Sequence, residues 1–176
     1  MSEKSNGKVI AVVAIAAALL GGLVLLFATS STSGPDSSDQ VVGALAPEIV
    51  GVDTTGTPFD LADSRGKWVF VNFFATWCPP CVAEHPELVA FSERNEGTAE
   101  VVSVAFDQPA EVIEEFFESN GGDWPVIAED TGGTVLDYGV IKLPESFLIS
   151  PEGVVVEKVA GGVTATSLEA MIAENS

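Results

Sequence analysis

The sequence has few cysteines and few basic residues. Only Cys78 and Cys81 occur among its 176 residues, which excludes a scaffold of several disulfides and a self-contained four-cysteine zinc site. Seven lysines and arginines stand against 26 aspartates and glutamates, so the formal net charge is −19. A polyanion of this kind repels nucleic-acid phosphate, which argues against DNA or RNA binding. The acidity fits either an ordinary solvated exterior or an adaptation to high salt.

The strong acidity contrasts with a mean hydropathy of +0.35, so apolar and acidic residues should occupy different parts of the chain. Residues 9–28 contain no charge, and a helix of that length spans about 30 Å, the thickness of a bilayer core. Lys4 and Lys8 precede this run, which predicts a cytoplasmic N-terminus at 1–8 and a transmembrane signal anchor at 9–28. The alternative is a cleaved signal peptide with a processing site near Ala28, although such peptides have shorter apolar regions.

Residues 29–45 are rich in Ser, Thr, Gly and Asp and predict a flexible linker to a domain at 46–176. In that domain an apolar run at 67–75 predicts a buried strand, and a helix follows from Pro79. The later pattern predicts a strand at 100–106, a helix at 109–120 and a helical turn at 131–138. A hairpin at 146–159 and a final helix, capped by Thr166 or Ser167, complete an α/β domain.

The informative motif is Cys-Pro-Pro-Cys at 78–81, at the predicted junction of a buried strand with a helix. Free N–H groups and the positive end of the helix dipole favour a thiolate at that position. We therefore expect Cys78 to be an exposed nucleophile with a lowered pKa, and Cys81, within the first turn, to face inward. Two sulfur atoms at this spacing can close a disulfide and release it again.

The cysteine pair has three other interpretations. As a structural staple the short loop would contribute only about 2 kcal/mol, so a redox role is favoured. A metal site could use Cys78, Cys81 and His85, but a copper chaperone would need a longer cysteine spacing and a distant histidine, and His85 is the only histidine, so we predict no metal. We expect His85 itself on the helix surface. A peroxidase would need Thr three residues before its reactive cysteine. Thr76 lies two before Cys78, which argues against antioxidant activity.

These residues resemble a known family. Trp77–Cys81 after an apolar strand resembles the thioredoxin superfamily, and the following Val82–Pro86 resembles its membrane-anchored TlpA/ResA/CcmG (DsbE) group. The segment Tyr138–Ile149 resembles the stretch of that group that contains a cis proline. The resemblance covers 46–176 and implies a thioredoxin-like three-layer α/β fold, with a mixed central sheet and helices on both faces.

The resemblance assigns roles to individual residues. Cys78 would attack a substrate disulfide, Cys81 would resolve the mixed disulfide, and a partly buried Glu84 with a raised pKa would move the proton of the resolving thiol. Pro144 would be the cis proline beside the disulfide. The chain departs from the family at Ile141-Lys142, where Gly is common, and at Ser146, where the family has Thr. The expected substrate-binding residues are Trp77, Pro79, Pro80, Leu143 and Pro144.

The implied function is an extracytoplasmic thiol-disulfide oxidoreductase of the protein-disulfide reductase type, held by a single-pass anchor in a bacterial or archaeal cell membrane. Its substrates would be protein disulfides such as the CxxCH cysteines of apocytochrome c, in cytochrome c maturation. Its electron donor would be a membrane carrier of the CcdA/DsbD type, and it needs no cofactor beyond the Cys78–Cys81 disulfide. The alternatives are a general disulfide reductase, a non-catalytic chaperone or binding module, and a metal chaperone.

Overall fold

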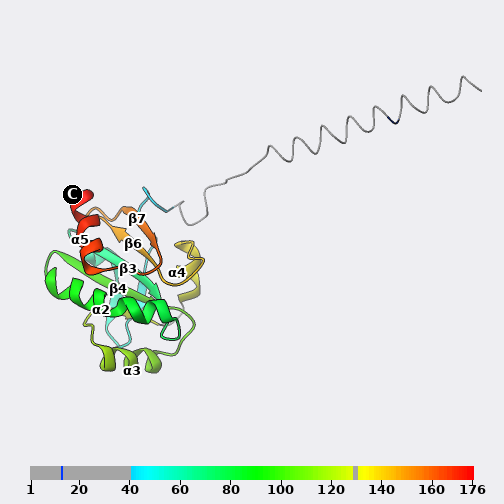
Figure 1. Cartoon of the computed structure of the whole chain (residues 1–176), viewed down its shortest axis with the longest axis vertical. Helices are drawn as coiled ribbons and strands as arrows, with labels where there is room; N and C mark the ends of the chain where they lie inside the picture. The colour runs from blue at the N-terminus through cyan, green and yellow to red at the C-terminus, as the bar shows by residue number, and fades with distance from the viewer. Residues whose placement is uncertain (1–12, 14–40, 129–130) are drawn as a thin grey trace, which may run out of the picture. The chain divides into compact units, whose positions relative to one another are not determined.

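The apolar run that follows Lys67 forms the central strand of a five-stranded mixed sheet. The computed structural model describes Val13, residues 41–128 and residues 131–176. The five strands are β5 (Val126–Ile127), β4 (Ala99–Ala105), β3 (Trp68–Phe74), β6 (Glu145–Ile149) and β7 (Val155–Ala160). They lie in the order β5-β4-β3-β6-β7, with β3 parallel to β4 and antiparallel to β6. The strands β4, β3, β6 and β7 are labelled in this order in Figure 1.

Helices cover both faces of this sheet, because side chains of a buried strand alternate between the two faces. Val69, Val71 and Phe73 of β3 pack in a core cluster that includes Val135 of α4 (Thr131–Asp137). Phe70 points to the other face, where α2 (Pro79–Arg94) and α5 (Ala165–Glu174) pack. The remaining elements are β1 (Val50–Val52), β2 (Pro58–Asp60), η1 (Leu61–Ser64) and α3 (Ala110–Asn120). The predicted three-layer fold with a mixed sheet is confirmed.

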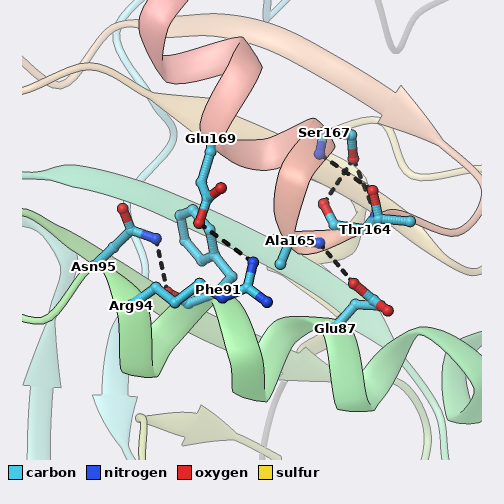
Figure 2. Close-up of polar contacts among 8 residues, drawn as sticks. All are labelled: Glu87, Phe91, Arg94, Asn95, Thr164, Ala165, Ser167 and Glu169. Carbon is cyan, nitrogen blue, oxygen red and sulfur yellow. Dashed lines mark hydrogen bonds and ion pairs between the residues drawn. The ribbon is translucent and has the colours of Figure 1, made fainter.

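Polar contacts join α2 to α5 along one side of the sheet (Figure 2). Glu87 accepts a hydrogen bond from the backbone N–H of Ala165 at 2.9 Å, and Arg94 lies 3.6 Å from Glu169. Thr164 caps α5 in a capping box with Ser167. The predicted cap at Thr166 or Ser167 is therefore wrong by two or three residues. The sequence could not distinguish Thr164, Thr166 and Ser167 as the cap, because each carries a hydroxyl. In the structure Thr164 has the extended backbone of an N-cap, and the other two lie inside the helix.

Ordered structure begins before the predicted domain boundary. Residues 41–45 fall in the predicted linker, yet Gly43 donates a hydrogen bond to Val155 at 2.7 Å and Leu45 pairs with Val154. The predicted cytoplasmic segment 1–8, and the predicted anchor and linker except for Val13 and residues 41–45, lie outside the described residues. Within the described part of the chain, no helix is long and apolar enough to cross a membrane.

Candidate redox site

Cys78 lies at the junction of the central sheet with α2, as the motif predicts. It is the N-cap of α2, with an extended backbone, and Pro79 and Pro80 occupy the first helical positions, where a missing N–H costs nothing. The carbonyl of Cys78 accepts the hydrogen bond of Val82 at 3.1 Å. Cys78 and Cys81 form a disulfide, with their Cα atoms 5.3 Å apart. The helix N-terminus therefore faces the sulfur of Cys78, where it would stabilise a thiolate after reduction.

The two cysteines differ in access rather than in exposure. Cys78 is only 5% exposed in this disulfide form, so the expectation of an exposed nucleophile is wrong for the oxidised state. Cys78 nevertheless lines a groove of about 420 Å³, whereas Cys81 does not and is buried behind it. Both cysteines belong to a buried apolar cluster, against which Leu143 and side chains of α3 and the segment after it pack. A substrate sulfur can approach Cys78 through this groove.

Most of the predicted substrate-binding residues line the groove. Trp77, Pro79, Pro80 and Leu143 all line it, and Trp77 is 60% exposed. The Leu143–Pro144 peptide bond is cis, as the resemblance implied. Pro144 itself is buried and does not line the groove, and its carbonyl accepts a hydrogen bond from Gly161 at 2.9 Å.

Glu84 lies three residues after Cys81 in α2, so both side chains are on one face of the helix. The residue is only 3% exposed. Its carboxylate accepts hydrogen bonds from the Asn72 side chain at 2.9 Å and from the backbone N–H of Val163 at 3.1 Å. Burial raises the pKa of Glu84 to about 7, and the two hydrogen bonds partly offset that rise. The carboxyl group can therefore both bind and release a proton near neutral pH.

Sequence reasoning missed two side chains that hold the site. Asn72, the polar residue within the apolar run of β3, bonds both Glu84 and the Ser146 hydroxyl, the latter at 3.0 Å. Gln108 accepts the N–H of Thr76 at 2.7 Å and donates to its hydroxyl at 2.6 Å, so it anchors the turn before Cys78. A polar residue inside a buried strand was a usable signal for Asn72. Nothing in the local sequence pointed to Gln108.

A buried ion pair supports the loop before Pro144. Glu145 accepts a hydrogen bond from the backbone N–H of Ile141 at 3.1 Å and pairs with Lys158 at 3.0 Å. The Lys158 ammonium also lies 5.5 Å from the centre of the Phe147 ring. The carboxylate thus ties one wall of the groove to the central sheet.

His85 is buried rather than on the helix surface, which corrects our expectation. It is 4% exposed, and its Nε2 lies 2.8 Å from the carbonyl oxygen of Gly121. The rings of Phe116, Phe117 and Trp124 surround it at centroid distances of 4.8–5.5 Å. These rings come from α3 and the segment after it, which the helical pattern of α2 alone could not place. No group of three or more metal-binding side chains occurs in the described ranges.

We expect His85 to weaken the fold in acid. Burial lowers the pKa of His85 below 6.5, so the unfolded chain binds a proton that the folded chain resists. Stability should therefore fall as pH drops below 6.5. His85→Gln keeps an N–H donor for the Gly121 carbonyl and should lose less stability between pH 7 and pH 5. Denaturant unfolding of the oxidised chain at both pH values measures the difference. Equal losses in the two proteins would contradict the expectation.

Comparisons with known proteins agree with this site. The chain matches the Redoxin family over residues 41–174. Thiol-disulfide oxidoreductase ResA of Bacillus subtilis strain 168 is 40% identical over 124 residues, covering 69% of each chain. ResA of Geobacillus kaustophilus strain HTA426 is 34% identical over 131 residues, covering 73% of this chain and 74% of that protein.

Solved structures give the same result. A thioredoxin-family thiol:disulfide interchange protein from Chlorobium tepidum TLS superposes with a TM-score of 0.67 at 28% identity, covering 74% of this chain and 94% of that one. A DsbF homologue from Corynebacterium diphtheriae superposes with a TM-score of 0.69 at 25% identity, covering 74% and 86%. With its cysteine pair at the start of α2, the chain therefore belongs to the redoxin family, as a thiol-disulfide oxidoreductase of the ResA/DsbE type.

Proposed function

We propose that the protein is a membrane-anchored reductant of protein disulfides outside the cytoplasm. The observation that carries the proposal is the asymmetry of the site. Of the two cysteines only Cys78 lines the groove, while Cys81 is buried behind it and shares a helix face with Glu84. This arrangement suits a protein that attacks an incoming disulfide with one sulfur and resolves the product with the other.

The reaction transfers two electrons to the substrate. The Cys78 thiolate attacks one sulfur of the substrate disulfide, a mixed disulfide forms, and the other substrate sulfur leaves as a thiolate. Glu84, in its carboxylate form, then takes the proton of the Cys81 thiol. The Cys81 thiolate attacks Cys78, which restores the protein disulfide and releases the second substrate thiolate. A dithiol donor returns the protein to its reduced form.

The carboxyl group near the cysteine pair favours the reducing direction. The reduced pair can carry thiolate charge, whereas the disulfide carries none. The start of α2 stabilises a thiolate at Cys78, but an ionised Glu84 on the same helix face as Cys81 disfavours negative charge there and so favours the disulfide form. A pair whose disulfide form is favoured has a low reduction potential and gives its electrons readily.

The substrates and donor follow from the family resemblance. We propose the CxxCH cysteines of apocytochrome c as substrate, and a membrane carrier of the CcdA/DsbD type as the dithiol donor. The uncharged run at 9–28 supports the anchor, and it would keep the domain at the membrane where both partners occur. A chain released from membranes without detergent would contradict the anchor.

The reduction potential of the Cys78/Cys81 pair tests the direction of electron flow. We expect a value of about −270 mV or lower, near that of thioredoxin, and a value of about −120 mV, as in the strongly oxidising DsbA, would overturn the reductant assignment. Equilibration of the full chain in detergent with defined thiol–disulfide buffers, followed by thiol labelling, measures it. A deletion strain should lack c-type cytochromes, and normal levels would favour a general disulfide reductase instead.

A further inference from the structure

The groove beside Cys78 has apolar walls and one charged side chain. Trp77 and Ile141, which is 70% exposed, present apolar surface to solvent at its edges. Exposed apolar surface next to a reactive group indicates a site that another molecule covers. Lys142 is the only charged residue among those that line the groove. It lies in the loop before Pro144, at a position where the chain departs from the family pattern.

Lys142 also differs from most of the other basic residues of the domain. Lys67 pairs with Glu100, Arg94 with Glu169 and Lys158 with Glu145. Lys142 and Arg65 make no ion pair within the described part of the chain, and of these two only Lys142 lines the groove. The Lys142 ammonium group therefore places a positive charge at the groove of a protein that has 26 acidic residues. The hydrogen bond from the Ile141 N–H to the Glu145 carboxylate fixes the loop that carries Lys142.

We propose that Lys142 selects substrate segments that carry an aspartate or glutamate beside the reacting cysteine. This inference rests on the proposed function. The occupant is an extended segment of a protein disulfide, whose apolar side chains cover Trp77 and Ile141 while its carboxylate meets the Lys142 ammonium. Charge complementarity carries the proposal, because the groove offers one cation and no anion of its own.

The acidic remainder of the domain opposes this selection only weakly at the groove. Asp107 follows the groove residue Phe106, and Asp137 ends α4, but neither lines the groove. At physiological ionic strength charges are screened over about 8 Å, so a direct contact at Lys142 should outweigh carboxylates that do not line the groove. If the overall charge governed recognition instead, basic segments would be preferred.

Three synthetic peptides test the proposal. Each contains one disulfide and differs only in having Glu, Gln or Lys two positions from the cysteine that is attacked. The full chain, reduced and held in detergent at about 0.15 M salt, should reduce the Glu peptide about two- to fivefold faster in kcat/KM than the Gln peptide, the range expected of one exposed ion pair. The Lys peptide should be slowest.

Variants separate Lys142 from general charge effects. Lys142→Glu should invert the order, so that the Lys peptide becomes fastest, and Lys142→Met should remove the preference. Arg94→Glu makes the same change in net charge away from the groove and should keep the wild-type order. A wild type that reduces the Lys peptide fastest, or a Lys142→Glu variant that keeps the wild-type order, would overturn the proposal.

A binding measurement keeps this test independent of the proposed function. If none of the three peptides is reduced, the reductase function fails. Serine analogues of the peptides can still be titrated against the oxidised chain, which needs no electron transfer. Tighter binding of the Glu analogue, lost in Lys142→Met, would support the selection by Lys142, and equal binding of all three would refute it.

Discussion

Cys78→Ser should abolish the reduction of protein disulfides, whereas Cys81→Ser should stop the reaction after its first step. We expect a loss on the order of a thousandfold or more for Cys78→Ser, because a hydroxyl at this position cannot replace a thiolate as nucleophile. Cys81→Ser retains the sulfur that lines the groove and should accumulate a mixed disulfide with the substrate. Single-turnover kinetics and mass spectrometry of the trapped adduct measure the two outcomes.

The two serine variants are matched controls for each other. Both lose the same disulfide, whose short loop contributes about 2 kcal/mol, so a general loss of stability would affect them equally. A difference in their chemistry must come from the different positions of the two sulfur atoms. A mixed disulfide that forms on Cys81 in the Cys78→Ser variant, with none in Cys81→Ser, would reverse the assigned roles.

The sequence alone predicted those parts of the site whose structure is set by residues that are close together in the chain. The run before Ala75 alternates apolar side chains between two core clusters, and the prolines after Cys78 fix a helix start. The cis bond before Pro144 was expected from its resemblance to a known segment, and the structure has it.

The parts that sequence could not predict depend on residues far apart in the chain. Glu84 is hydrogen-bonded to Val163, 79 residues away in the sequence, and Gln108 is hydrogen-bonded to Thr76, 32 residues away. The burial of His85 depends on aromatic rings from another helix. The sequence of its own helix therefore wrongly predicted a surface position. The low exposure of Cys78 likewise depends on segments far along the chain, because its cluster includes Ile113 and packs against Leu143.

Glu84→Gln should slow the second step of the reaction and remove a pH dependence near 7. The carboxyl group has a pKa of about 7 because burial disfavours its charge, so it changes protonation in the range where the Cys81 thiol must lose a proton. Loss of a general base costs on the order of a hundredfold in rate. We expect resolution of the mixed disulfide to slow by that factor and its inflection near pH 7 to disappear.

Glu87→Gln is the matched control for this prediction. Glu87 lies one turn further along α2 and accepts the backbone N–H of Ala165 at 2.9 Å, much as Glu84 accepts that of Val163. Glu87 lies six residues after Cys81, too far along the helix to reach its thiol. Its replacement should therefore leave the rate of mixed-disulfide resolution and its inflection near pH 7 unchanged. An inflection near pH 7 that persists in Glu84→Gln would assign the titration to another group.

The stability of the oxidised chain gives an independent measure of the same carboxyl group. The pKa of Glu84 rises from 4.5 in the unfolded chain to about 7 in the fold, so the folded chain holds a proton that the unfolded chain has released. This contribution is complete below pH 4.5 and is lost as pH rises through 7, a change of about 3 kcal/mol. Glu84→Gln should remove that decline. Denaturant unfolding of both proteins between pH 4.5 and 8 measures it, and parallel curves would show that Glu84 is ionised throughout.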